Sequence, residues 1–441
     1  MKNRKIEKMN FPETSRRPLA TRLNYARQVR QAVGGPVRKH KPDYWLVALT
    51  VVLLAIGLTV VYSIGPALSA TRGEGSASHY VIRQMIAIAL SGVAFFVTSK
   101  IPLRIWRNWQ WLLLGAALLG TLVALLTPVI PAYPAHRWIR LGGLSLQSVE
   151  LVKFALLIAT SGFLALQAKR GELSNNKQTL YPILGMLAIV AVLVAAIQSD
   201  LGSMGVIVAM VGMMAYVAGL PLKRLMLIGG AVAIAVILLV SSTPYRRARV
   251  VAYLNPSAHC QTTGYQACKA LIAIGSGGVA GLGVGHGAQA YGYLPEAQND
   301  SIFAIYAEKF GLFGSLLLLG IFGLLFSRMK NIAERAPTLF GRLVVIGVLA
   351  WLSVQTIINI GAMIGLLPLK GITLPLVSYG GTSVLFVGAA LGLVFQISKY
   401  TSFSSRAVTP SEGRGGSHED SSDRRRFRGA YHSNPGSRRR N

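Results

Sequence analysis

The chain has 441 residues, of which 52% are hydrophobic and only 14% are charged, yet its formal net charge is +30. Soluble globular domains are about a quarter charged, so this composition excludes an ordinary soluble enzyme and indicates a polytopic membrane protein. Residues 1–43 carry a net charge of +9 and residues 402–441 a net charge of +5, so much of the charge lies in two tails. We expect that charge to set membrane topology, and we predict no nucleic-acid partner.

Apolar runs long enough to cross a membrane account for most of the chain. In chain order we place ten of them at Trp45–Ile64, Tyr80–Thr98, Trp111–Thr127, Leu146–Leu166, Leu180–Gln198, Gly202–Ala218, Leu225–Val240, Ile302–Phe326, Leu343–Leu366 and Ser383–Ile397. The sequence therefore predicts an all-α fold with ten transmembrane helices in a membrane domain of residues 44–400.

An even number of spans places both tails on one side of the membrane. That side holds 34 of the Lys and Arg residues and the other side 11, so the positive-inside rule predicts that both termini are cytoplasmic. Residues 1–43 form a basic arm, whose stretch Thr21–Val33 either lies on anionic lipid as an amphipathic helix or stays solvated. Residues 401–441 form an Arg-rich tail that we expect to be disordered.

The longest outer segment, residues 241–301, is too apolar and too rich in glycine to form a separate soluble domain. We expect it to dip into the bundle as re-entrant or interfacial structure. Both cysteines of the chain, Cys260 and Cys268, lie in this segment on the side where disulfides persist. They form either a disulfide, which would stabilise the fold by roughly 2.5 kcal/mol, or two small apolar fillers.

Acidic residues are rare between the tails, and those near the outer membrane edge are candidates for function. They are Glu150, Asp200, Glu296, Asp300 and Glu308. Glu150 and Lys153 share a helix face, so they form either a buried ion pair or the lining of a polar cavity. Asp200 is expected to cap the following helix. Asp300 precedes an apolar span and is either a helix cap or a general base.

Several basic residues lie on the outer side, against the charge rule. They are Arg137, Arg140, Arg246, Arg247, Arg249, Lys309 and Lys370. Such a set either captures the phosphate oxygens of an anionic lipid headgroup or interacts with membrane phosphates at the interface. The chain has no Walker loop and no His/Cys ligand spacing, so we predict no metal site and no cofactor, and the need for a divalent cation stays open. This pattern argues against ATP-driven transport.

Six runs of the sequence together resemble the SEDS family of peptidoglycan polymerases, whose branches are FtsW and RodA. The runs are residues 137–143, 147–153, 200–202, 264–266 with 270–278, 294–311 and 374–383. The resemblance implies a ten-helix bundle in the bacterial cytoplasmic membrane with a cavity facing the outer leaflet. It also implies polymerisation of lipid II, in which a sugar hydroxyl of one molecule attacks the anomeric carbon of another and displaces polyprenyl pyrophosphate.

The resemblance also assigns roles to residues. Asp300 matches the catalytic aspartate, and Glu150 and Lys153 match a pair that lines the cavity. The arginines Arg137, Arg140, Arg246 and Arg249 would stabilise the leaving group, and Gln266, Glu296 and Ser378 would line the same site. The run at residues 370–376 and the long basic arm indicate a protein closer to FtsW than to RodA, hence a role in cell division.

The family works with a class B penicillin-binding transpeptidase, so the resemblance implies that partner and other division proteins. Two other functions fit a bundle with buried charges. One is a lipid-linked precursor transporter, or flippase, and the other is a non-catalytic scaffold of the division machinery. The outer position of the acids argues against alternating access, which places polar groups near the membrane midplane. The presence of Asp300 argues against the scaffold.

Overall fold

The computed structural model describes residues 37–72, 78–126, 137–141, 144–241 and 244–402, and the fold is built from α-helices. The first half contains α2 (Tyr44–Arg72), α3 (Ser78–Lys100), α4 (Leu103–Asn108), α5 (Gln110–Leu126), α6 (Ser148–Arg170), α7 (Tyr181–Ala191) and α8 (Leu201–Ala218). The second half contains α9 (Leu222–Ser241), α10 (Pro244–Leu254), α11 (Tyr265–Gly277), α12 (Ile302–Arg335), α13 (Leu339–Met363) and α14 (Gly381–Ser398). Helical turns at Asn176–Leu180 and Val192–Ile197 extend α7 at both ends.

The helices coincide with the predicted apolar runs. Eight helical segments among the described residues are long and apolar enough to cross a membrane, which confirms a multi-pass membrane fold. Helix α5 is apolar over 17 residues, and α9, of 20 residues, covers the seventh predicted run. Each of the ten runs therefore has a helix, while the number that cross the membrane stays a prediction.

The main difference from the predicted boundaries is the end of α12. We expected this span to end near Phe326, but the helix continues to Arg335. Nothing in the sequence from Phe326 to Arg335 breaks a helix, and Pro337 stops it because the residue before a proline avoids helical geometry. Ala336 accordingly has φ −60° and ψ 130°. The charged residues expected in a loop thus extend the helix beyond its apolar part.

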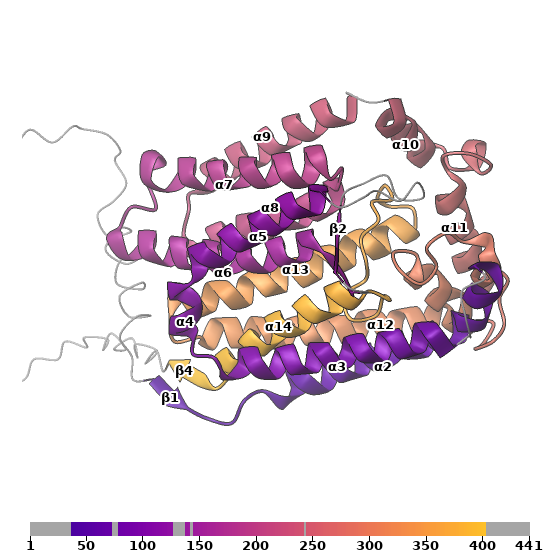
Figure 1. Ribbon diagram of the computed structural model, residues 1–441, viewed down its shortest axis with the longest axis horizontal. Helices are drawn as coiled ribbons and strands as arrows, with labels where there is room; N and C mark the ends of the chain where they lie inside the picture. Colours follow the sequence, from indigo (N-terminus) through magenta and orange to yellow (C-terminus); the bar gives the residue numbers. More distant parts are fainter. Residues whose placement is uncertain (1–36, 73–77, 127–136, 142–143, 242–243, 403–441) are drawn as a thin grey trace, which may run out of the picture. The chain divides into compact units, whose positions relative to one another are not determined.

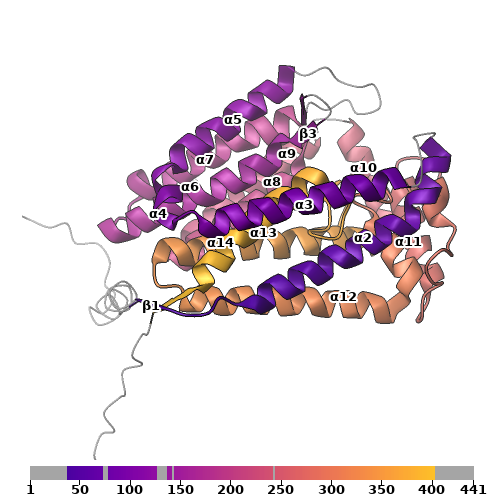
Figure 2. The same cartoon turned by 60° about the horizontal axis from the view of Figure 1, so that its bottom comes forward.

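Helices α6, α13 and α14 form the most buried part of the bundle, whereas α3 keeps most of its surface exposed. Helices α3 and α14 nevertheless pack closely, as Figures 1 and 2 show. The Ser91 hydroxyl donates to the Val384 carbonyl at 2.8 Å, and the Thr98 hydroxyl donates to the Ala389 carbonyl at 2.8 Å. Small residues and hydroxyls are the usual means by which helices associate in membranes.

Two short antiparallel sheets mark opposite ends of the bundle (Figure 1). Strand β1 (Val37–Lys39) pairs with β4 (Tyr400–Ser402), so the two ends of the membrane domain are hydrogen-bonded neighbours. At the other end, β2 (Trp138–Leu141) pairs with β3 (Leu144–Gln147). The sequence between these two strands is Gly-Gly, which favours a two-residue hairpin. The predicted all-α class therefore holds with these two small additions.

The long outer segment packs against the bundle instead of forming a domain of its own. Its helix α11 contacts α12 and α13, and the turn Gln289–Tyr293 contacts α2. The glycine run between them wraps the start of α12, where the N–H groups of Leu282 and Gly283 donate to the carbonyls of Glu308 and Lys309. How deep this segment lies in a membrane stays a prediction.

The predicted tails lie almost entirely outside the described residues, which include only residues 37–43 of the basic arm and 401–402 of the Arg-rich tail. The amphipathic stretch Thr21–Val33 is also outside them.

Candidate functional site

Asp300 lies in a tight turn directly before α12, at the end of the bundle that carries β2, β3, α10 and α11. The N–H groups of Asn299 and Ser301 both donate to the Glu296 carbonyl, at 3.0 and 3.2 Å. Glu296 itself has φ +50°, a left-handed conformation that non-glycine residues rarely adopt. The N-cap position of α12 belongs to Ser301. Asp300 therefore immediately precedes the N-cap position.

Asp300 lines a small cavity together with a lysine and an amide. The cavity is lined by Asp300, Ile358, Asn359, Ala362, Met363, Lys370, Gly371 and Ile372. Lys370, which the sequence indicated only as one of several outer basic residues, thus shares a cavity with the candidate base. A carboxylate and an ammonium group in one cavity suit a reaction that moves a proton and builds up anionic charge.

Two buried amides of α13 hold the loop that covers this cavity. Gln355 donates from Nε2 to the Thr373 carbonyl at 2.9 Å. Asn359, one helical turn later, donates from Nδ2 to the Ile372 carbonyl at 2.6 Å and to the Asp300 carbonyl at 2.7 Å. Sequence reasoning missed both amides. The sequence feature that could have identified them is their spacing: a Gln and an Asn four residues apart lie on one face of an apolar span, where polar side chains are rare.

Glu150 and Lys153 form a buried ion pair on α6. Lys153 Nζ lies 2.7 Å from Glu150 Oε1, and both side chains are at most 4% exposed. The Lys153 ammonium also donates to Gln355 Oε1 at 3.1 Å and lies 4.9 Å from the centre of the Trp351 ring. Neither residue lines the Asp300 cavity or the larger cavity beside it. Of the two roles considered from the sequence, the structure contains the ion pair.

Asp200 caps α8, as the sequence predicted. Its carboxylate accepts from the Ser203 N–H at 2.9 Å and from the Ser203 hydroxyl at 2.8 Å. The turn before it is held by Arg137, which donates from Nε to the Gln198 carbonyl and from Nη2 to the Ser199 carbonyl, both at 2.9 Å. Arg137 therefore ties the start of the β2–β3 hairpin to this turn, a contact that sequence reasoning did not anticipate.

The other basic candidates are located only by their backbone. Arg140 lies in β2, and Arg246 and Arg249 lie in α10, while their side chains are outside the described parts of the structure. Arg247, next to them, is exposed. All of them belong to elements at the same end of the bundle as Asp300 (Figure 1).

Ser378, Glu296 and Gln266 all contact the Asp300 turn. The Ser378 hydroxyl donates to the Asn299 carbonyl at 2.6 Å, and Glu296 Oε2 accepts from Asn299 Nδ2 at 2.5 Å. Gln266, on α11, donates from Nε2 to the Ser301 hydroxyl at 3.0 Å. These residues support the turn, and Gln266 also lines a second cavity.

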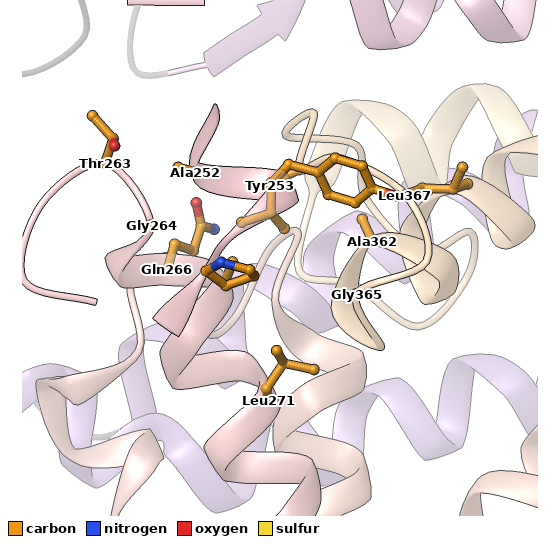
Figure 3. A pocket seen from close by; sticks show the side chains of 12 residues that line it. Ala252, Tyr253, Thr263, Gly264, Gln266, Leu271, Ala362, Gly365 and Leu367 are labelled. Carbon is orange, nitrogen blue, oxygen red and sulfur yellow. The ribbon is translucent and has the colours of Figure 1, made fainter. Parts of the chain in front are cut away.

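The second cavity, which is larger than the first, lies between α11 and the end of α13 (Figure 3). Gln266 and Leu271 face it from one side, and Ala362, Gly365 and Leu367 face it from the other. The Tyr253 ring forms a further wall, fixed by a hydrogen bond from its hydroxyl to the Leu366 carbonyl at 2.8 Å. Ala362 lines both cavities, so the larger one adjoins the Asp300 cavity.

A disulfide joins Cys260 to Cys268 in the first turns of α11, and the Cα atoms of the two cysteines are 5.4 Å apart. Four residues between the two cysteines line the larger cavity, namely Thr263, Gly264, Gln266 and Ala267. A covalent bridge there restricts the geometry of one cavity wall.

A second pair of charged residues is buried at the start of α12. Glu308 and Lys309 are 1% and 2% exposed. Glu308 Oε1 accepts from the Gln289 N–H at 3.2 Å, and Lys309 Nζ donates to the His286 carbonyl at 3.3 Å. Gly287, with φ +106°, passes so close to Glu308 that a Cβ there would lie 2.6 Å from its carboxyl carbon. These charges hold the glycine-rich segment and line neither cavity.

The described residues contain no cluster of three or more His, Cys, Asp or Glu side chains arranged to hold a metal ion.

Comparison with known proteins places the chain in a family. A model of the FtsW/RodA/SpoVE family, described as cell cycle protein, matches residues 44–403. A probable peptidoglycan glycosyltransferase FtsW of Coxiella burnetii (strain RSA 493 / Nine Mile phase I) is 38% identical over 366 residues, covering 81% of this chain and 96% of the relative. Stage V sporulation protein E of Bacillus subtilis (strain 168) is 34% identical over 367 residues, covering 83% and 99%.

Solved structures agree. A structure described as the coordination of polymerization and crosslinking by a peptidoglycan synthase complex aligns with a TM-score of 0.64 at 27% identity, covering 81% of this chain and 97% of that one. The rod shape determining protein RodA of Thermus thermophilus aligns with a TM-score of 0.59 at 27% identity, covering 81% and 96%. The family match over most of the chain and these relatives show that the chain belongs to the FtsW/RodA/SpoVE family.

Proposed function

We propose that this chain polymerises lipid II into glycan strands at the outer face of the bacterial cytoplasmic membrane, with Asp300 as the general base. The chain is accordingly an enzyme, a peptidoglycan glycosyltransferase, as several relatives are named. The observation that carries the proposal is the cavity that Asp300 shares with Lys370 and Asn359. Its position at the end opposite β1 and β4 agrees with an outward-facing site when both termini are cytoplasmic.

The reaction joins two lipid-linked disaccharides. A hydroxyl oxygen of one sugar forms a bond to the anomeric carbon of the other, while the bond from that carbon to the polyprenyl pyrophosphate oxygen breaks. The Asp300 carboxylate accepts the hydroxyl proton as attack develops, a role that typically accelerates reactions by roughly 10²- to 10⁴-fold. The pyrophosphate leaves with its electron pair. Lys370 stabilises the charge, together with four arginines whose elements lie at the same end of the bundle, Arg137, Arg140, Arg246 and Arg249.

The larger cavity is the expected place for a substrate sugar. Its walls combine the Tyr253 ring and leucines with the polar side chains of Gln266 and Thr263, a mixture typical of small-molecule sites. A sugar held there would lie next to Asp300 across the shared Ala362. Glu150, Lys153, Glu296 and Ser378 support the site from around it.

The partners follow from the same activity. We expect a class B penicillin-binding transpeptidase that crosslinks the new strands, together with other division proteins and membrane lipids. The fold similarity to a peptidoglycan synthase complex supports a joint polymerising and crosslinking assembly. The similarity to FtsW relatives supports a role in division.

The test uses purified protein in nanodiscs, alone and with the transpeptidase, supplied with labelled lipid II. Wild type should form glycan strands visible by gel electrophoresis, and Asp300→Ala should form none. Equal product from both proteins would contradict the assigned base. Movement of labelled lipid between leaflets with no polymer would favour a transporter, and an inactive wild type that recruits the transpeptidase would favour a scaffold.

A further inference from the structure

Hydrogen bonds of two amides on α13, linked through the backbone of Ile372 and Thr373, connect the buried ion pair of α6 to the turn that carries Asp300. Lys153, paired with Glu150, donates to Gln355 Oε1 at 3.1 Å. Gln355 in turn donates to the Thr373 carbonyl at 2.9 Å. Asn359, on the same face of α13, donates to the Asp300 carbonyl at 2.7 Å and to the Ile372 carbonyl at 2.6 Å. Three elements that are distant in sequence therefore meet at two amides.

Each amide has only one orientation that satisfies its neighbours. Gln355 Oε1 accepts from the Lys153 ammonium and from the Trp351 indole N–H at 2.8 Å, and both of these groups can only donate. Its Nε2 faces the Thr373 carbonyl, which can only accept. Asn359 Nδ2 likewise faces two carbonyls. Turning either amide over would place oxygen against oxygen, so both side chains are fixed by their partners.

These amides hold both walls of the Asp300 cavity. Asn359 binds the backbone of Asp300 itself and the carbonyl of Ile372, two residues beyond Lys370. Gln355 binds the next residue of that loop, Thr373. Both side chains are at most 2% exposed, so water does not compete for these bonds. The separation between the Asp300 carboxylate and Lys370 therefore depends on α13.

We propose that Gln355 and Asn359 are positioning residues for glycosyl transfer and that the Glu150–Lys153 ion pair acts on the reaction through them. This inference rests on the proposed function and adds residues that act through Asp300 instead of touching the reacting sugars. It also gives the ion pair a use, because a buried ion pair alone adds little net stability compared with apolar residues of similar size.

The first experiment measures steady-state polymerisation of labelled lipid II by Gln355→Leu and Asn359→Leu in nanodiscs. A displacement of about 1 Å at a catalytic group can lower the rate roughly 100-fold, so we expect kcat to fall by about that factor with little change in KM. Thr356→Val is the matched control. Thr356 is buried on the same helix, but its hydroxyl donates to the Leu352 carbonyl of α13 itself, so kcat should stay at the wild-type value.

The second experiment separates positioning from folding. The double variant Glu150→Leu/Lys153→Met replaces the ion pair by apolar side chains, which often leaves stability unchanged. We expect its melting temperature in detergent to stay near that of wild type while kcat falls as in Gln355→Leu. Adding Gln355→Leu to this double variant should lower kcat no further, because residues acting in one network are not additive.

Gln355→Glu is the second variant if Gln355→Leu does not fold. It keeps an acceptor for Lys153 and Trp351 and loses the donor to Thr373, so kcat should still fall. Wild-type kcat in folded Gln355 and Asn359 variants, or multiplicative losses in the combined variant, would overturn the inference. Wild-type protein that does not polymerise lipid II would instead overturn the proposed function. If wild type polymerises lipid II and Asp300→Ala does not, the proposed function stands, and the amide variants then test this inference alone.

Discussion

The two ends of the bundle are built in different ways. At the end that carries Asp300, segments from four parts of the chain are tied together by part-buried side-chain hydrogen bonds and a disulfide. At the other end, the β1–β4 pair and the lysines Lys39, Lys100 and Lys399 gather next to the helix ends. The Asp300 end contains acidic and basic side chains together with amides, whereas at the β1–β4 end these three lysines lie close to one another.

We infer that the Asp300 end serves the reaction, whereas the β1–β4 end serves to orient the chain in the membrane. The lysines at the β1–β4 end repel one another, and burial together with Lys100 and Lys39 lowers the pKa of Lys399. Such a cluster is unfavourable for folding, but it agrees with the positive-inside rule if this end is cytoplasmic, as we propose. At the Asp300 end, an ion pair and amides hold the loops in position, although burying these polar groups is itself unfavourable. Substitutions at the two ends should therefore affect different properties.

The largest expected difference concerns one carboxylate at each end. Asp300→Asn removes the proposed base while keeping its size, and polymerisation should fall by roughly 10²- to 10⁴-fold. Glu334→Gln, on the exposed far end of α12, should leave the rate unchanged. Both rates are measured with labelled lipid II. A comparable loss in both variants would show that the two ends do not differ in this respect.

The disulfide provides the second test. The double substitution Cys260→Ser/Cys268→Ser should lower the unfolding free energy by about 2.5 kcal/mol, since it opens a short loop. Thermal unfolding in detergent with and without reductant measures this, and reductant should not affect the double variant. Wild-type protein should label with a thiol reagent only after reduction, so equal labelling under both conditions would refute the bond.

A close backbone contact beneath the site provides the third test. A Cβ on Gly57 of α2 would lie 2.8 Å from the Val377 Cα, in the loop that precedes α14. Gly57→Ala should therefore destabilise the protein by about 1–3 kcal/mol through overpacking. Gly92→Ala on α3 is the control, because that glycine has nothing within 4 Å of an added Cβ. Melting temperatures should fall in the first variant and be unchanged or slightly higher in the second.

The smallest effect is expected at the β1–β4 end. Because the pKa of Lys399 is below its usual 10.5 in the folded protein, the unfolded chain binds more protons, and stability should rise as pH increases through the folded pKa toward 10.5. Lys399→Met lacks this group and should lose part of that rise without any change in polymerisation. Melting temperatures between pH 7 and 10.5 measure it. An unaltered pH dependence in the variant would contradict the assigned shift.

Much of the fold was predictable because a long apolar run in the sequence indicates a membrane-spanning helix. The Asp200 cap and the Glu150–Lys153 pair were also within reach, since both are short-range patterns on one helix or turn. The contacts of Gln355 and Asn359 were not, because their partners lie on another helix and on loops distant in sequence. Tertiary contacts of this kind leave no periodic signal. The same holds for Arg137, whose bonds to the turn before Asp200 depend on how the hairpin folds.

The β1–β4 pairing has a consequence for how the chain can be rearranged. Val37 and Ser402 are cross-strand partners, so the two ends of the membrane domain already meet. A short linker joining them would need to span only the width of one strand pair, about 5 Å. The domain is therefore suited to circular permutation, with new termini opened in an exposed connection such as the one around Gly171, between α6 and α7.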